Sequence, residues 1–280
     1  SRAQVLFKDP YIFNRRMDSL VTVYWALQEN PSFTEETIGT TLQVSKKHTK
    51  KDRTFYRYTL KDVDVSDLQV SPAEAGIQNL RLSGPSFSYT HDSRDDFFNP
   101  RKGNFDSLDV SLFPESLGSD LDMVKFYGLG AWFKRVSDWG VWAQALRMGF
   151  EIPYGNTTEI PISERFFTGG DTTVRGYDRD EVGPKDPVTG NPLGGQTLIV
   201  INEELRYPVW RVLSGVVFLD GGNVTSTIPE FFPLRLRWAA GLGIRVDTPI
   251  GPFRLEYGWK LNREPGESPG EWNFSIGQAF

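Results

Sequence analysis

The chain has 280 residues, of which 39% are hydrophobic and 24% are charged, with a formal net charge of −5. This charge excludes the basic surface of a nucleic-acid-binding protein, so we expect no nucleic-acid partner. The absence of cysteine excludes a disulfide scaffold, a thiolate metal site and a cysteine nucleophile. The length suits one large all-β domain or two small domains. The sequence contains no run of about 18 apolar residues, so it predicts no transmembrane helix.

Apolar and polar residues alternate with a period of two through almost the whole chain, and helical periodicity is nearly absent. In chain order the alternation predicts strands near residues 3–8, 17–28, 34–46, 53–63, 77–92, 103–113, 120–136, 139–151, 197–208, 212–220, 234–247, 252–261 and 271–280. Most of these segments exceed the roughly 5–6 residues usual in soluble sheets and suit the roughly 9–11 residues that cross a bilayer at a tilt. Bacterial single-chain barrels have an even number of strands, so the odd count indicates a miscounted segment or a missing start.

Two architectures produce such alternation, a soluble β-sandwich and a transmembrane β-barrel. One segment sets Arg235, Arg237 and Arg245 on the face opposite its apolar residues. Charged residues at every second position favour a barrel with a water-filled lumen, in which the apolar face of the strand is turned to lipid. Short and long connections alternate, with Thr248–Pro252 as one tight turn, and aromatic residues lie near many segment ends. We therefore predict an all-β fold, a transmembrane antiparallel β-barrel over residues 1–280.

The longest gap between predicted strands covers residues 153–195 and is rich in Gly, Pro, Asp and Thr. A structureless connection of this length is uncommon in a compact domain unless it has a function or is disordered. Gly169, Gly170 and Gly176 can supply positive φ or close backbone approach around Arg175. By composition the segment is either a surface loop with a chance arginine or a functional loop built around that arginine.

Several motifs carry a family resemblance. RFFTGGDTTVRGY (165–177), followed by Gly-Pro at 183–184, resembles the loop signature of the outer-membrane protein 85 superfamily, of the BamA/TamA type. The resemblance continues, in the family's order, through NEELRYPV (202–209), VVFLDGGNV (216–224), AAGLGIRVDTPIGPFRLEYG (239–258) and WNFSIGQAF (272–280). Upstream, YTHDSRDDFFNPRKG (89–103) is similar to a short periplasmic turn of that family.

The family barrel has sixteen strands, and five of them follow the long sixth outer loop. Five predicted strands follow the loop here, but eight rather than eleven precede it. The resemblance therefore implies that the chain is the C-terminal part of a larger barrel, without the first three strands and the periplasmic POTRA domains. A genuine smaller barrel of twelve strands is the alternative.

The resemblance also implies that the long loop plugs the lumen through an anchor. Its expected members are Gly169, Gly170, Asp171, Arg175, Gly176 and Tyr177, with Glu204 and Asp220 as acidic partners of Arg175. The alternation of both strands allows Glu204 and Asp220 to point inward. A guanidinium inside a barrel is costly unless it is paired. The alternative is three solvated lumen charges without mutual contact.

The C-terminal segment resembles the signal by which such barrels are themselves recognised. Its alternation sets Trp272, Phe274, Ile276 and Phe280 on one side. Gly277 is expected to weaken the last strand beside a lateral seam and let it bend. An ordinary strand that happens to end in phenylalanine is the alternative interpretation.

The resemblance implies an outer-membrane insertase whose barrel opens laterally and pairs a strand edge with a client strand. The alternatives are a two-partner-secretion translocator with a dedicated substrate, a passive porin-like channel and, with least support, an outer-membrane hydrolase. His48 and His91 form no credible catalytic dyad, so we expect no catalytic residue, metal or cofactor. Expected partners are unfolded outer-membrane clients, the lipid bilayer, and accessory lipoproteins or an inner-membrane partner, in a bacterial outer membrane.

Overall fold

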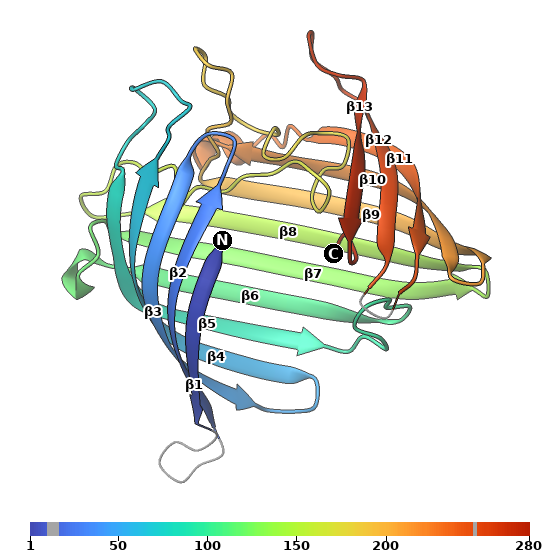
Figure 1. Cartoon of the computed structure of the whole chain (residues 1–280), viewed down its shortest axis with the longest axis horizontal. Helices are drawn as coiled ribbons and strands as arrows, with labels where there is room; N and C mark the ends of the chain where they lie inside the picture. Colours follow the sequence, from blue (N-terminus) through green and yellow to red (C-terminus); the bar gives the residue numbers. More distant parts are fainter. Residues whose placement is uncertain (10–16, 249–250) are drawn as a thin grey trace.

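The computed structural model describes residues 1–9, 17–248 and 251–280. These residues form thirteen strands, which confirms the predicted all-β antiparallel fold (Figure 1). The strands are β1 (Arg2–Asp9), β2 (Asp18–Glu29), β3 (Thr34–Lys47), β4 (Asp52–Ser66), β5 (Asn79–Asp92), β6 (Gly103–Phe113), β7 (Met123–Ser137), β8 (Gly140–Pro153), β9 (Thr197–Trp210), β10 (Leu213–Thr225), β11 (Arg237–Val246), β12 (Phe253–Lys260) and β13 (Gly270–Ile276). Two short 3-10 turns, Glu115–Leu117 and Pro229–Phe231, complete the regular structure of this part of the chain. Within it, no helix is long and apolar enough to cross a membrane.

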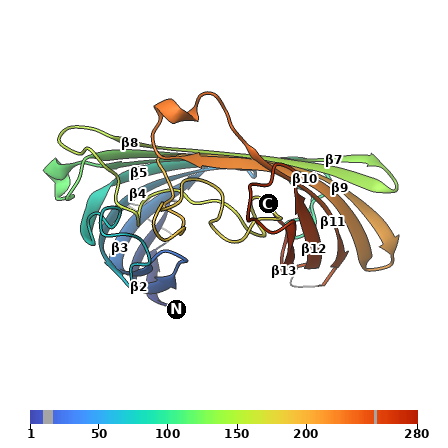
Figure 2. The ribbon, with the colours of Figure 1, turned by 90° about the horizontal axis from the view of Figure 1, so that it is seen from above.

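Each strand pairs with its neighbours in the chain, so the sheet order is the chain order from β1 to β13. Figure 2 shows a sheet that curls into a trough whose two ends approach each other without meeting. Among the described residues, β1 pairs only with β2 and β13 only with β12. The thirteen-stranded sheet is therefore open, and each end has an unpaired edge.

The connections alternate in length, as the sequence predicts. Segments 67–78, 114–122, 154–196, 226–236 and 261–269, together with the short connection 30–33, join strands at one end, which we call the long-loop end. Segments 48–51, 93–102, 138–139 and 211–212 join strands at the other, which we call the turn end. The predicted tight turn at 248–252 includes Pro249 and Ile250, which lie outside the described residues.

The two faces of the sheet reverse the pattern of a soluble protein. On β11, Leu242 on the convex face is 54% exposed, whereas Arg245 on the concave face is only 2% exposed. The same alternation leaves Leu255 and Trp259 of β12 exposed and buries Glu256. Exposed apolar residues on a convex sheet face, with charges inside, are the arrangement that lipid would cover.

Several predicted strand boundaries are wrong. The segment expected at 212–220 continues to Thr225, the one at 53–63 continues to Ser66, and the one at 120–136 begins only at Met123. The segment expected at 234–247 begins only at Arg237, because Asn223 Nδ2 donates to the Arg235 carbonyl and fixes a loop there. Arg235 is exposed in that loop and is not a lumen residue. The segment expected at 271–280 ends at Ile276, since Gly277 adopts φ +102° and turns the chain away from the sheet direction.

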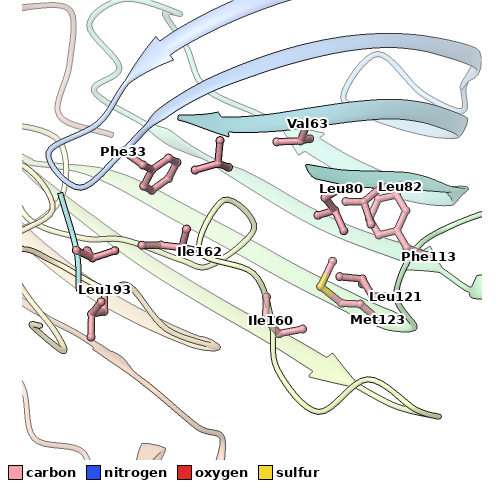
Figure 3. Packing of buried hydrophobic residues seen from close by; sticks show 12 residues of the cluster. Phe33, Val63, Leu80, Leu82, Phe113, Leu121, Met123, Ile160, Ile162 and Leu193 are labelled. Carbon is pink, nitrogen blue, oxygen red and sulfur yellow. The ribbon is translucent and has the colours of Figure 1, made fainter. Parts of the chain in front are cut away.

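The core lies between the concave face and the long loop, residues 154–196, which occupies the trough (Figure 2). Ile160, Ile162 and Leu193 of the loop belong to one apolar cluster with Leu82 of β5 and Met123 of β7. Figure 3 shows Ile160 near Met123, and Ile162 and Leu193 on the side of Phe33. Burying each aliphatic side chain of this size contributes about 1.5–3 kcal/mol. Apolar packing thus holds the loop inside the sheet, and it positions the charged residues described next.

Candidate functional site

Two glycines permit close approaches of the loop backbone, Gly169 within the loop and Gly258 between the loop and β12. Gly169 has φ +120°, and a Cβ there would lie 2.4 Å from the Asp178 carbonyl oxygen, so only glycine fits the turn. On β12, a Cβ at Gly258 would lie 2.7 Å from the carbonyl carbon and oxygen of Arg175 and from the Gly176 nitrogen. The backbone of the RGY motif therefore rests directly on a side-chain-free point of the strand.

Arg175 is completely buried and makes a bidentate ion pair with Asp220. Its Nε donates to Asp220 Oδ2 at 2.7 Å, its Nη2 donates to Oδ1 at 2.8 Å, and its backbone N–H donates to Oδ2 at 3.1 Å. Its Nη1 donates to Glu204 Oε1 at 2.5 Å and to Glu256 Oε2 at 3.0 Å. The Cζ atom lies 3.6 Å from the centroid of the Phe218 ring. Three carboxylates and an aromatic face thus surround one guanidinium, the pairing that makes a buried charge tolerable.

The acids around Arg175 are shared with further arginines of the lumen. Arg245 donates from Nη2 to Glu204 Oε1 at 2.7 Å and to Glu256 Oε1 at 2.6 Å. Arg206 Nε donates to Glu204 Oε2 at 2.7 Å, and Arg254 Nη1 donates to Glu256 Oε2 at 3.2 Å. We call Arg175, Arg206, Arg245, Arg254, Glu204, Asp220 and Glu256 the lumen ion cluster. Its strands β9, β10, β11 and β12 are consecutive in the sheet, so the cluster ties the loop to four strands at once.

Of the residues predicted for the anchor, Arg175, Glu204 and Asp220 belong to this cluster, and Asp171 contacts it through Arg254, whereas Gly169 and Gly170 pack within the loop. Tyr177 is buried, and its hydroxyl donates to Asn262 Oδ1 at 3.3 Å and accepts from Arg237 Nε at 3.2 Å. Asp171 is partly exposed, with its carboxylate 3.8 Å from Arg254. The structure brings Arg175 together with both predicted acids, Glu204 and Asp220. The alternative of lumen charges without mutual contact is therefore wrong.

Sequence reasoning missed Glu256 as a third acidic partner. Its signal was nevertheless present, because Arg254, Glu256 and Gly258 form the polar register of the predicted strand at 252–261. That pattern places Glu256 inside, but only the register of β11 with β12, in which Glu256 faces Gly243, sets its distance from Arg175.

Residues 1–280 match the Omp85 superfamily domain. The chain belongs to the Omp85 superfamily. It is 28% identical over 232 residues to the outer membrane protein assembly factor BamA of Nitratidesulfovibrio vulgaris, an overlap of 80% of this chain and 29% of that protein. Its fold is similar to BamA from Haemophilus ducreyi lacking POTRA domains 1–3, with a TM-score of 0.85, 15% identity, and coverage of 99% of this chain and 61% of that one. It is also similar in fold to CdiB from Acinetobacter baumannii, with a TM-score of 0.60, 12% identity, and coverage of 97% and 48%.

These matches confirm the family resemblance and the barrel type of the fold. The chain spans less than a third of the BamA relative from Nitratidesulfovibrio vulgaris. The Omp85 chain is thus comparable with the barrel portion of a longer protein, and the arrangement described here concerns that portion.

A second group of charges fastens another part of the loop of this Omp85 chain. Lys61 Nζ on β4 donates to Glu164 Oε1 at 2.6 Å, and Lys125 Nζ on β7 donates to the Glu164 carbonyl at 2.8 Å. Lys125 also lies 2.6 Å from the buried Glu151 carboxylate of β8. No motif marked these residues, and only their inward positions on separate strands bring them to the loop.

At the long-loop end, Asp186 joins the long loop to the β4–β5 connection. Its Oδ2 accepts from the Ser71 backbone N–H, and its Oδ1 accepts from Val188 N–H at 2.7 Å and Thr189 N–H at 3.3 Å. These donors, with Ser71 the strongest, lower the pKa of the Asp186 carboxyl to about 2. The carboxylate form therefore holds the two loops together at neutral pH.

The C-terminal segment divides at Gly277. Trp272 and Phe274 of β13 are 69% and 70% exposed, and Ile276 is exposed with them on the convex face. Phe280 was predicted to share that face, which is wrong. After Gly277 the chain turns inward, and the Phe280 ring stacks on Phe133 of β7 with centroids 6.2 Å apart.

Both histidines of the chain take part in contacts between neighbouring strands. The described residues contain no group of three or more His, Asp or Glu side chains placed to hold a metal ion. His91 Nδ1 lies 2.7 Å from Asp52 Oδ1, and Tyr89 donates to the same oxygen at 2.6 Å. His48 Nε2 lies 2.9 Å from Thr54 Oγ1 on the adjacent strand. Both imidazoles serve contacts between strands.

Proposed function

We propose that this Omp85 chain is the membrane-embedded part of an outer-membrane protein assembly factor that inserts client β-barrel proteins into a bacterial outer membrane. The printed name of the Nitratidesulfovibrio vulgaris relative supports this function. The exposed apolar convex face supports the membrane location, because that face needs lipid around it. The observation that carries the proposal is the match of residues 1–280 to the Omp85 superfamily domain, in a sheet whose exposed convex face is apolar.

The proposed mechanism uses main-chain hydrogen bonding between strands and involves no enzymatic reaction. Among the described residues β13 pairs with β12, and the proposed mechanism uses the other edge of β13. Such an edge pairs readily with an incoming strand, which receives its hydrogen bonds from the edge and its register from the alternation of side chains. The short length of β13, which ends at Ile276, would make this edge easy to separate from a closing strand. The energy comes from client folding and lipid burial.

The anchor keeps the lumen closed while clients pass along the edge. Arg175 fixes the loop to β9, β10 and β12 through Glu204, Asp220 and Glu256. A filled lumen disfavours a passive porin-like channel. A two-partner-secretion translocator would need this loop to leave the lumen during export, at the cost of separating Arg175 from three carboxylates. Accessory lipoproteins or an inner-membrane partner would bind outside the region described here.

The experiment replaces Arg175 with alanine in the full-length protein and measures client assembly in reconstituted lipid vesicles. We expect client assembly to fall at least about tenfold while the barrel still folds, as shown by heat-modifiable mobility on a gel. Arg57→Ala is the matched control, because Arg57 is a lumen arginine bonded to Gln43 and Ser88 on neighbouring strands. Normal assembly by the folded Arg175→Ala protein would remove the anchor from the mechanism. Failure of a client to crosslink to β13 would contradict the edge-pairing proposal separately.

A further inference from the structure

A small half-enclosed cavity lies at the turn end of the lumen, and we call it the turn-end pocket. Its volume is about 90 Å³, which suits a single small group. Five arginines line it, namely Arg101, Arg135, Arg206, Arg211 and Arg245, against the two acids Asp138 and Asp247. Arginines therefore outnumber acids among the lining residues, and two of them, Arg206 and Arg245, also contact Glu204 behind the pocket.

The acids of the pocket do not neutralise this excess. Asp138 is bound by Arg135, whose Nη2 donates to its Oδ1 at 2.7 Å. Asp247 accepts a hydrogen bond from Asn99 Nδ2 at 3.1 Å. Asp95 Oδ1 accepts from the Arg101 backbone N–H at 2.8 Å, but among the described residues no ion pair involves the guanidinium of Arg101 or Arg211. The Arg211 guanidinium lies 5.0 Å from the Trp210 ring centroid.

Arg206 is the buried group that points to a ligand. The residue is only 6% exposed, and within the described residues its side chain hydrogen-bonds Glu204 alone, which Nε reaches at 2.7 Å. In the described part of the chain, Nη1 and Nη2 are buried without any acceptor. Cζ lies 5.5 Å from the Phe133 ring centroid and 5.4 Å from that of Phe280. Aromatic faces attract the charge but leave the N–H donors in the guanidinium plane unsatisfied.

The acids of the lumen ion cluster do not supply the missing acceptors of Arg206. The cluster joins four arginines to three buried carboxylates, and Asp171 adds a fourth acid 3.8 Å from Arg254. Buried N–H donors without acceptors are costly. An anion at Arg206 would supply those acceptors.

We propose that the turn-end pocket binds one oxyanion group, a carboxylate or a phosphate, that enters from the turn end. Arg206 Nη1 and Nη2 form the fork that holds two oxygens, since planar guanidinium geometry matches both groups. Arg101 and Arg211 flank the entrance and attract the anion. The group is carried either by a free ion or by a peptide segment on the turn side. This site is separate from the Arg175 anchor and does not depend on the proposed assembly function.

The test measures the thermal unfolding midpoint of the full-length protein in detergent at constant ionic strength, while sodium acetate or sodium phosphate replaces sodium chloride. Binding to the folded state raises the midpoint in a saturable way, whereas a general salt effect does not saturate. We expect Arg206→Gln to weaken the apparent affinity at least about tenfold, because it removes a charge-assisted fork. The matched control is Arg81→Gln, because Arg81 is exposed and paired with Asp62 away from the pocket. No saturable rise in the wild type, or an equal rise in Arg206→Gln, would overturn the site.

A second variant covers the case in which Arg206→Gln does not fold. Arg101 and Arg211 are both exposed, so the double change of Arg101→Gln and Arg211→Gln leaves the buried cluster intact and should weaken the same binding several-fold. Equal binding by this variant would then count against the proposal. A short peptide with a free carboxylate, compared with its amide, separates the two sources. If the peptide acid binds more tightly than both acetate and the peptide amide, the ligand is a peptide carboxylate. If the peptide acid and acetate bind with equal affinity, the ligand is a free ion. Equal binding of the peptide acid and the peptide amide excludes carboxylate recognition.

Discussion

Gly258 is the position where one methyl group should release the long loop. In the structure the loop backbone at Arg175 and Gly176 rests on this glycine, and an added Cβ would lie 2.7 Å from three of their backbone atoms. Ordinary contact begins at 3.4 Å, so Gly258→Ala demands a backbone displacement of about 0.7 Å. The displacement acts on the segment that carries the Arg175 guanidinium into its three carboxylates.

The expected cost follows from the geometry of the ion pair. Arg175 Nε now lies 2.7 Å from Asp220 Oδ2, and the displacement would carry it beyond the roughly 3.2 Å at which such bonds remain good. Overpacking of this kind costs about 1–3 kcal/mol. The ratio of docked to undocked loop should therefore fall roughly 5- to 150-fold.

The assay is hydrogen exchange of the backbone amides of residues 166–182 in the full-length protein in lipid nanodiscs. Val182 and Gly170 donate within this segment, to Thr168 O at 2.9 Å and Tyr177 O at 3.0 Å, so both amides report on docking. Gly128→Ala on β7 is the matched control, since its added Cβ would meet no heavy atom nearer than 3.9 Å. If Gly258→Ala exchanges no faster than Gly128→Ala, the close backbone contact does not hold the loop.

Three further changes test the other attachments of the loop. Glu256→Gln removes a buried carboxylate from Arg175 and should cost roughly 3–5 kcal/mol, seen as a lower urea midpoint; an unchanged midpoint would show that Glu204 and Asp220 suffice. Lys61→Met leaves Glu164 buried without its partner and should speed proteolysis after Arg165, whereas wild-type rates would contradict that contact. Asp186 has a lowered pKa of about 2, so its stabilisation is complete above pH about 4 and is lost as the pH falls through 2. Cleavage near residues 185–192 by an acid-active protease should rise as the pH falls from about 4 to about 2. Asp186→Asn should lack this rise, and a protease active at pH 7 should cleave it faster than the wild type.

The strands were predictable because their signal is local. A β-strand shows its two faces at every second residue, so the alternation over Phe253–Lys260 reveals both the strand and its buried side. Most predicted segments agree with the observed strands to within three residues, but the segment at 212–220 ends five residues before β10 does, and two segments are shortened where a turn competes. At Leu234 a loop hydrogen bond prevails over the alternation, and at Gly277 a positive φ does. Neither the loop hydrogen bond nor the positive φ produces a periodic pattern in the sequence, so the alternation of apolar and polar residues does not reveal them.

The anchor was predictable only in part. The RGY motif and the inward registers of Glu204 and Asp220 identified the main ion pair, whereas the fastening at Lys61 and Glu164 had no motif and joins positions 103 residues apart. Long-range pairs of this kind depend on where the loop lies in the trough, and many inward charges are equally available in the sequence.

The sequence by itself determined the antiparallel all-β fold, the apolar outer face, the long loop and the identity of its central arginine, because each is written in periodicity or in a contiguous motif. Only the tertiary structure decided that Glu256 completes the anchor, that Phe280 turns inward, and that Arg206 is buried with two nitrogens unpaired. The physical reason is register. Alternation states which face a side chain occupies, but distances across four strands and a folded loop depend on strand pairing and packing, which arise only when the whole sheet is assembled.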